Sequence, residues 1–272
     1  MSTTVSRAAA GGAPGRPLRA VEPAAFAGVF LRETTLFRRV WPSSTFGAIV
    51  EPTINLLAFG FGLGALVSTV QGIPYIQFIG TGTVATAVLF SSVFAGMFDT
   101  YVKRVYMKTY DGILAAPVDV PELFLAEACW IAVKAGVFGL APLLVAIVFG
   151  LPPSWGMLAI PFIGFLTGFG IALMGMSFSG VVPSIDSFNY VQSALVTPMF
   201  LLAGIFFPLQ GLPSWIATLA QVNPLYHCVQ LVRDAVFGWQ PADDLWHVLA
   251  LVAFAAVMAP LAIRVLRRRL ID

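Results

Sequence analysis

Charged residues are scarce in this sequence. Only 10% of its 272 residues are Asp, Glu, Lys or Arg, and 58% are hydrophobic, whereas a soluble globular domain usually carries roughly a quarter charged residues. A chain of this composition cannot cover itself with a polar surface, which excludes a soluble domain. The net charge of +2 is small and the basic residues gather at the ends and in one loop, a pattern that does not favour nucleic-acid binding.

Lysine is especially rare, which bears on nucleotide binding. A Walker A loop requires Gly, four residues, and then Gly-Lys-Ser/Thr. None of the three lysines, Lys103, Lys108 and Lys134, follows a glycine. The sequence therefore lacks this phosphate-binding loop, and active transport would draw its energy from a gradient or from another subunit.

Cysteine and targeting signals are also sparse. Cys129 and Cys228 have no metal-ligand spacing, and we interpret them as packing residues. Residues 1–20 are rich in Ala, Gly, Pro and Arg and lack the apolar core of a secretory signal peptide. We expect them to form a disordered cytoplasmic tail.

Long hydrophobic runs are what the sequence does have. Several approach the ~20 residues that a helix needs to cross a bilayer. They predict an all-α membrane protein with one transmembrane domain at 44–272. Its six transmembrane helices are expected at 45–67, 76–98, 123–149, 157–182, 191–207 and 245–263.

An amphipathic interfacial helix is expected before the first span, at 21–43, with Pro42 ending it. Its apolar face contains Phe26, Val29, Phe30, Phe37, Val40 and Trp41. Glu33 lies in the middle of that face. It either extends to water or forms an ion pair with another segment.

The basic residues predict the orientation. With six spans, thirteen of the fifteen Lys and Arg residues fall on one side, which the positive-inside rule assigns to the cytoplasm. Both termini are then cytoplasmic, in a multi-pass protein of the cell (inner) membrane.

Two connections are long. The cytoplasmic one, 99–122, mixes charges with a turn-prone run and is expected to be a short docking element. The other, 208–244, is unusually apolar. Its segments 212–222 and 225–237 are too short to span a bilayer, so we expect a re-entrant helical hairpin between the fifth and sixth spans.

A few polar residues inside the spans are candidate functional groups. Glu51, Glu127 and Lys134 either pack structurally or line a substrate path. Glu127 and Lys134 share a helix face but lie about 10 Å apart, too far for a direct pair. The small-residue pairs Gly60 with Gly64 and Gly164 with Gly168 fit close helix packing, either within the chain or between subunits.

Enzymatic chemistry has weak support. His227 and His247 are the candidates for an intramembrane transferase, but they form no recognisable metal site with the nearby aspartates and no nucleophile has a partnered base. A gradient-driven carrier is a further alternative, although it normally requires carboxylates near the midplane.

The arrangement as a whole resembles the permease subunits of ABC-2 type transporters, and most of all the nodulation-factor and lipo-oligosaccharide export permeases. The stretches that carry this resemblance are EPTINLLAFGFGLG at 51–64, YIQFIGTGTVAT at 75–86, AEACWIAVKA at 126–135, TPMFLLAGIFFP at 197–208 and NPLYHCVQLVR at 223–233.

The resemblance implies a homodimeric permease, not an enzyme, that exports a lipid-linked saccharide or another amphipathic substrate. A separate ATP-binding cassette subunit would bind ATP and Mg²⁺, so no cofactor or metal is expected in this chain. Docking of that subunit would fall on Tyr110, Asp111, Pro117, Asp119, Glu122, Glu33, Arg38 and Arg39. The substrate path between the two permeases would be lined by Phe59, Phe61, Phe90, Phe94, Phe200 and Phe206.

Overall fold

The computed structural model describes residues 21–209 and 213–270, and most of these residues are helical. The expected tail at 1–20 lies outside the described residues. The long helices are α1 (Pro23–Gly62), α2 (Tyr75–Phe94), α4 (Val120–Phe138), α5 (Leu140–Val148), α6 (Ile160–Val181), α9 (Ser214–Val222), α10 (Pro224–Phe237) and α11 (Pro241–Leu270).

Short elements connect or extend these helices. The strands β1 (Thr69–Val70) and β2 (Ile73–Pro74) pair antiparallel in a small hairpin before α2. The other short elements are η1 (Ala95–Asp99), η2 (Val102–Tyr106), α3 (Thr109–Leu114), η3 (Trp155–Ala159), η4 (Ile185–Ser187), α7 (Phe188–Val191), η5 (Gln192–Val196) and α8 (Thr197–Leu201).

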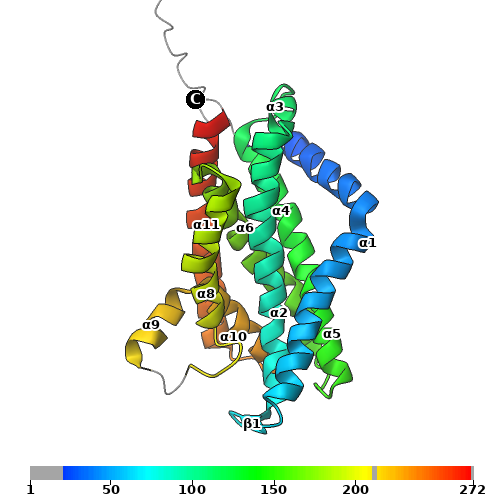
Figure 1. Cartoon of the computed structure of the whole chain (residues 1–272), viewed down its shortest axis with the longest axis vertical. Helices are drawn as coiled ribbons and strands as arrows, with labels where there is room; N and C mark the ends of the chain where they lie inside the picture. The colour runs from blue at the N-terminus through cyan, green and yellow to red at the C-terminus, as the bar shows by residue number, and fades with distance from the viewer. Residues whose placement is uncertain (1–20, 210–212, 271–272) are drawn as a thin grey trace, which may run out of the picture.

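The centre of the bundle is formed by α2, α4 and α6 (Figure 1). Helix α6 packs against α2, α4 and α11, while α1 packs on the outside against α2 and α4. Most of α2 is buried from Tyr75 to Val93. Because α2 is mostly apolar and carries no charged side chain, it suits a central position in the bundle.

Close helix contacts depend on glycine. A Cβ on Gly164 would lie 2.9 Å from the Cα of Gly136 on α4, and a Cβ on Gly168 would lie 2.8 Å from the Cβ of Ala135. Of the two alternatives for this small-residue pair, packing within the chain is therefore the one observed.

Helix α1 corrects one expectation from the sequence. Pro42 does not end the interfacial helix, because α1 continues without interruption from Pro23 to Gly62. Proline inside a helix removes one backbone hydrogen bond and kinks the helix when it does not break it. Figure 1 shows α1 changing direction partway along its length, so the interfacial helix and the first span form one bent element.

The N-terminal part of α1 packs on protein. Rings of Phe30 and Phe37 lie 5.4 and 5.6 Å from the Trp130 ring on α4, and Val29 is buried. Val40 and Trp41 are exposed. Only part of the expected apolar face therefore lies against the bundle.

Within the described residues, five helical segments are long and apolar enough to cross a membrane: Pro23–Gly62, Tyr75–Tyr106, Val120–Val148, Trp155–Val181 and Pro241–Leu270. They correspond to the expected first, second, third, fourth and sixth spans. In place of the expected fifth span there is a shorter helical segment at 188–201, formed by α7, η5 and α8. We call this segment the rod.

The junction of α9 and α10 contacts the C-terminal part of the rod. Asn223, at the junction of α9 and α10, donates from Nδ2 to the carbonyl oxygen of Met199 at 2.6 Å. Its Oδ1 accepts from the amide of Leu225 at 3.0 Å and so caps α10. One side chain therefore satisfies backbone groups of both the rod and α10.

Candidate functional site

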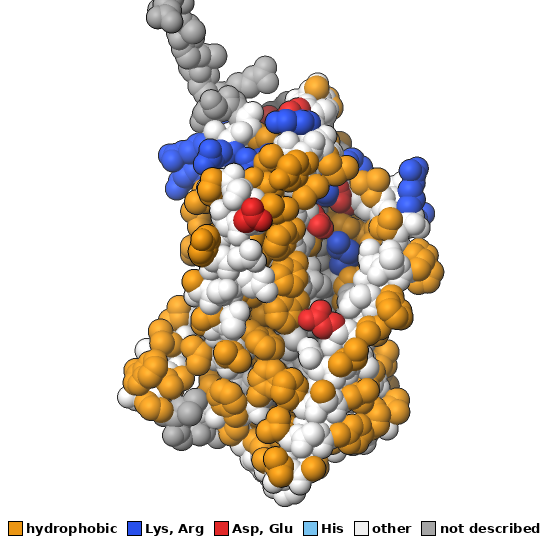
Figure 2. Space-filling view, viewed as in Figure 1, with side chains coloured by type: hydrophobic (Ala, Val, Ile, Leu, Met, Phe, Trp, Pro, Cys, Tyr) orange, Lys and Arg blue, Asp and Glu red, His pale blue; other side chains and the backbone are white. Residues whose placement is uncertain are grey.

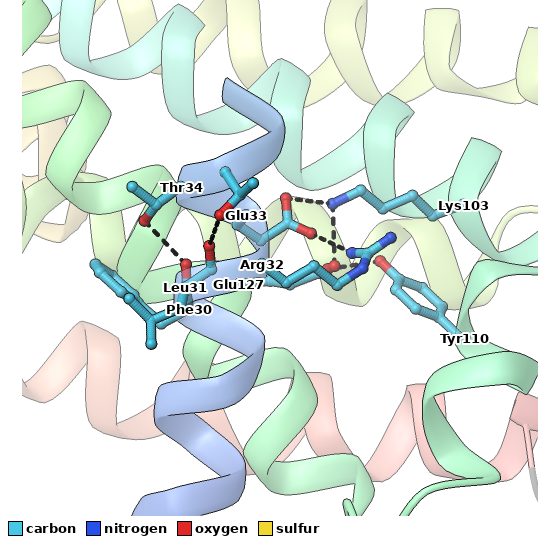
Figure 3. A network of polar contacts seen from close by, with 9 residues as sticks. Phe30, Leu31, Arg32, Glu33, Thr34, Lys103, Tyr110 and Glu127 are labelled. Carbon is cyan, nitrogen blue, oxygen red and sulfur yellow. Dashed lines mark hydrogen bonds and ion pairs between the residues drawn. The ribbon is translucent and has the colours of Figure 1, made fainter. Parts of the chain in front are cut away.

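A buried ion network joins three parts of the chain at the end of the bundle that carries the C-terminus (Figure 3). The Nζ atom of Lys103 lies 2.9 Å from Oε2 of Glu33 and 3.0 Å from Oε1 of Glu127. Glu33 belongs to α1, Lys103 to η2 and Glu127 to α4. Lys103 therefore ties the N-terminal part of α1 to two elements of the central bundle.

Two further side chains complete this network. Arg32 donates from Nη1 to Oε1 of Glu33 at 2.7 Å, and the hydroxyl of Tyr110 donates to Oε2 of Glu127 at 2.6 Å. Two cations thus balance two carboxylates. Such balance is needed because a buried carboxylate without a partner costs several kcal/mol.

Tyr110 connects the network to α3, within the connection that was expected to be a docking element. Its ring is fully buried and lies 5.1 Å from the Phe124 ring in an edge-on arrangement. Burial, reinforced by the nearby Glu127 carboxylate, raises the pKa of the Tyr110 phenol well above its ordinary value. The phenol stays protonated at neutral pH and remains a donor to Glu127.

The residues expected to dock an ATP-binding subunit separate into two groups. Tyr110, Glu33 and Glu122 are buried. Glu122 and Asp119 form the capping box of α4, in which Oε2 of Glu122 accepts from the Asp119 amide at 2.9 Å. The side chains exposed to a partner are those of Asp111, Pro117, Arg38 and Arg39.

A groove of about 460 Å³ is lined by one of these exposed residues, Pro117. It runs between the start of α1, at Gly28 and Arg32, and the loop after α3, at Ala116 and Pro117. The backbone amide of Glu22 donates to Oε1 of Glu122 at 2.6 Å and connects the residue before α1 to the first turn of α4. This end of the molecule therefore presents a concave surface with charged groups at its rim.

A row of aromatic rings runs along α2. We call it the aromatic stripe: Phe59, Phe90, Phe94, Phe98, Tyr101, Phe188, Phe200 and Phe206. Successive ring centroids, taken in the order Phe59, Phe206, Phe200, Phe90, Phe94, Phe98, Phe188 and Tyr101, lie 4.8, 5.2, 5.4, 5.5, 5.9, 4.7 and 5.6 Å apart. These separations are those of interacting aromatic pairs.

Five of the six phenylalanines expected to line a path belong to this stripe. Phe61 does not, because it contacts Phe149 at 5.1 Å and is 55% exposed. Phe59, Phe90, Phe94, Phe200 and Phe206 are partly buried, so each packs on the core and keeps part of its surface open.

The remaining intramembrane charges lie apart from one another. Glu51 is exposed, and Nζ of Lys134 lies 5.9 Å from the centroid of the Phe37 ring. Lys134 and Glu127 are therefore not paired, as their separation on the helix predicts.

A second polar cluster lies at the far end of the bundle. Nδ1 of His227 is 2.7 Å from Nδ1 of His247, and Nε2 of His227 contacts the carbonyl oxygen of Gln221 at 2.8 Å. Burial lowers the pKa of His227. Over the described ranges, no group of three or more His, Cys, Asp or Glu side chains could hold a metal ion.

Comparison with known proteins decides the family. The family model described as ABC-2 type transporter matches residues 25–237. The chain belongs to the ABC-2 type transporter family. It is 33% identical to "Nodulation protein J" of Sinorhizobium fredii (strain NGR234) over 90% of this chain and 93% of that protein.

Two further relatives agree with this assignment. "Nodulation protein J" of Rhizobium meliloti is 32% identical over 89% of this ABC-2 chain and 92% of the relative. "Inner membrane transport permease YadH" of Escherichia coli K12 is 23% identical over 77% of this chain and 82% of the relative. This ABC-2 protein is therefore an integral membrane transporter subunit rather than a catalytic enzyme, and its family implies an ATP-binding cassette partner.

Sequence reasoning missed the centre of the ion network of this ABC-2 permease. Neither Lys103 nor Arg32 was expected to pair with Glu33, although both contact its carboxylate in the folded chain. The available signal was that Glu33 lacks a partner on its own apolar face and Lys103 follows the second span directly. The expected set of path residues does not contain Phe98, Tyr101 and Phe188, whose rings extend the aromatic stripe.

Proposed function

We propose that this protein is the permease subunit of an ATP-driven exporter of the inner membrane, with six crossings and both termini in the cytoplasm. The distribution of charge supports the orientation. Figure 2 shows Lys and Arg side chains gathered at the end that carries the C-terminus, while the rest of the visible surface is largely hydrophobic. The positive-inside rule places such an end in the cytoplasm.

The rod at 188–201 is the proposed fifth crossing, and α9 with α10 form the proposed re-entrant hairpin. The contact between Asn223 and Met199 supports this proposal. Irregular backbone is tolerated at membrane depth only where protein or water satisfies it, and Asn223 satisfies the end of the rod.

The ATP-binding partner is proposed to dock on the groove between α1 and the loop after α3. Its contacts would be Pro117, which lines the groove, and the exposed residues Asp111 on α3 and Arg38 and Arg39 on α1. The buried members of the expected set, Glu33, Tyr110 and Glu122, would not touch the partner. Together with Asp119 they would support the docking surface through contacts inside the protein. ATP and Mg²⁺ would bind to the partner.

The observation that carries this proposal is the ion network. Tyr110 of the docking element, Lys103 at the end of the second span and Glu33 of α1 are linked through hydrogen bonds of 2.6–3.0 Å. A displacement of the docking element by the partner would therefore move α1 and α2 together rather than bending one loop.

The substrate path is proposed to run along the aromatic stripe, between two copies of the permease. Half-buried rings can stack on sugars or contact acyl chains, which suits an amphipathic substrate such as a lipid-linked saccharide. The resemblance to lipo-oligosaccharide exporters supports this substrate class.

Co-expression with a candidate ATP-binding subunit tests the proposal. We expect the two proteins to co-purify and the ATPase rate to change in the complex. Asp111→Arg should abolish co-purification, whereas the control Asp186→Arg, an exposed acidic residue before α7, should not. Co-purification that survives Asp111→Arg and similar charge reversals at Arg38 and Arg39 would contradict the docking surface.

Export itself requires a second measurement. In proteoliposomes that contain both subunits, transport should need ATP and persist in the presence of an uncoupler. Transport that an uncoupler abolishes in the absence of any partner would instead indicate a gradient-driven carrier.

A further inference from the structure

A second groove, of about 570 Å³, lies between α6, α8, α11 and the tip of the α9–α10 hairpin. Nearly all of the side chains that line it are apolar, and the exceptions are Ser177 and Asn223. It lies apart from the docking groove and from the aromatic stripe, because none of its lining residues belongs to either. The ion network and the aromatic stripe therefore do not account for it.

The two polar side chains of this groove are already satisfied by the protein. The Ser177 hydroxyl donates to the carbonyl oxygen of Leu173 at 2.8 Å. Asn223 makes its two hydrogen bonds to backbone groups of Met199 and Leu225. Neither polar side chain of the groove is therefore left to bind a ligand, so an occupant must be apolar.

One wall of the groove is a regular face of α11. Phe254, Met258, Leu261 and Val265 follow one another at intervals of four, three and four residues and all line the groove. At 1.5 Å per residue this wall is about 16 Å long. The next position on the same face is Arg268, whose side chain is exposed.

Other arginines lie around Arg268. Arg264 is exposed one turn earlier on α11, and Nε of Arg269 donates to the carbonyl oxygen of Gly180 at 3.0 Å, which brings the ends of α11 and α6 together. Figure 2 shows the basic side chains gathered at this end of the molecule. An apolar groove within the bundle thus leads directly to a cationic end.

We propose that this groove holds one acyl chain of an anionic phospholipid, with the lipid phosphate at Arg264 and Arg268. A phospholipid has the same order of chemistry along its length, an apolar chain followed by an anionic group. Chain burial and attraction to basic residues both favour binding. The inference requires only that the chain lies in a membrane, so it is independent of ATP-driven export.

A second copy of the permease fits the groove less well. Two copies in the same orientation would bring their arginine ends together at the same membrane surface. Like charges placed opposite one another disfavour such a contact. An anionic lipid would be attracted to the arginines rather than repelled, because its phosphate neutralises their positive charge.

Native mass spectrometry of the purified protein tests this inference. The lipids to compare are phosphatidylglycerol and phosphatidylcholine with identical acyl chains, and glycerol phosphate serves as the headgroup alone. We expect phosphatidylglycerol to bind as a retained adduct and to raise the melting temperature. Phosphatidylcholine should bind more weakly, and glycerol phosphate should have no effect.

Variants test the phosphate-binding arginines and the acyl-chain groove separately. Arg264→Gln with Arg268→Gln should weaken phosphatidylglycerol binding by roughly fivefold per arginine. The control pair Arg38→Gln with Arg39→Gln removes the same charge from α1 and should change binding by less than about twofold. Leu261→Trp should fill the groove and prevent adduct formation, whereas Val252→Trp, on the opposite face of α11, should not.

Three outcomes would overturn the inference. The first is equal binding of phosphatidylglycerol and phosphatidylcholine by the unaltered protein. The second is stabilisation by glycerol phosphate alone, which would indicate a soluble phosphate site. The third is a change of oligomeric mass in Leu261→Trp with unchanged lipid binding, which would make the groove a contact between copies.

Discussion

Lys103 and Glu33 are 70 residues apart in the sequence, and the Nζ atom of Lys103 lies 2.9 Å from Oε2 of Glu33. The contact holds the N-terminal part of α1 against the helical extension of α2. Because Lys103 also contacts Glu127 at 3.0 Å, it neutralises charge on two elements at once. Removing it would leave two carboxylates close together with only Arg32 to balance them.

Lys103→Met is therefore expected to lower the free energy of unfolding by about 3 kcal/mol, the lower end of the range for breaking a buried ion pair. The lower end applies because the Lys103 side chain is 20% exposed. Chemical denaturation in detergent micelles measures the effect. Lys108→Met, at an exposed lysine, is the control, and equal stability of the two variants would contradict the role of Lys103.

Tyr110→Phe removes the hydroxyl that donates to Glu127 at 2.6 Å and leaves the packing of the ring in place. We expect a loss of about 2 kcal/mol, the usual contribution of a hydrogen bond to a charged group. Thermal unfolding compares this variant with Tyr106→Phe, at a residue that is 63% exposed. A melting temperature unchanged in both variants would mean that Glu127 does not depend on the phenol.

Asp119→Ala should destabilise the start of α4 by about 1 kcal/mol, because it removes the N-cap. Asp111→Ala, at an exposed position of α3, should change stability by less than about 0.5 kcal/mol. The two substitutions remove the same charge from the same connection. If Asp111→Ala destabilised the protein more than Asp119→Ala, the division into internal and docking residues would be wrong.

Asp234 predicts a dependence of stability on pH. Burial, the carboxylates of Asp244 and Asp243, and to a smaller extent the opposing charge of Arg233 set its pKa at about 6, above the ordinary value of 3.8. The folded protein therefore binds more protons than the unfolded chain between these values, so this group's stabilising contribution is complete below pH 3.8 and is lost as the pH rises towards 6.

Asp234→Asn should remove this part of the pH dependence. Melting temperatures measured between pH 4 and pH 7 in roughly half-unit steps are the appropriate measurement. The variant should show a flatter profile than the unaltered protein. A profile that keeps the same slope would assign the dependence to another group.

Phe94→Ala should slow export by roughly fivefold, because one aromatic contact contributes about 0.5–1.5 kcal/mol. Phe94 contacts both Phe90 and Phe98 in the aromatic stripe. The control is Phe162→Ala, at a phenylalanine on α6 that is 76% exposed. Transport in proteoliposomes that contain the ATP-binding partner measures both, and equal rates would exclude the stripe from the path.

Composition excluded a soluble domain, since 58% of the residues are hydrophobic and 10% are charged, and the long apolar runs then indicated a helical membrane protein. The long spans were also evident, since each is a continuous apolar run of sufficient length. Pro42 was misjudged for a local reason. Proline prevents one hydrogen bond and bends a helix, but the residues after it still favour a helix, and α1 continues.

The sites depended on tertiary structure. Sequence placed a lone carboxylate, Glu33, on an apolar face and could not choose between water and a partner. In the folded chain Glu33 has a partner, because Lys103, which is 70 residues away in the sequence, contacts its carboxylate. Likewise, the sequence suggested Phe90, Phe94 and Phe200. Only packing showed that the Phe188 ring lies beside Phe98 in the same row of rings, and that the Phe61 ring contacts Phe149 instead.

Hydrophobic length is a local property, so the sequence by itself determined the membrane class, the long spans and the absence of a Walker A loop. Charge pairing and ring stacking between distant segments are properties of packing. They require two helices to pack side by side with the interacting side chains at the same level and facing each other. The tertiary structure alone therefore decided which charges neutralise one another and which residues of the expected docking set are exposed.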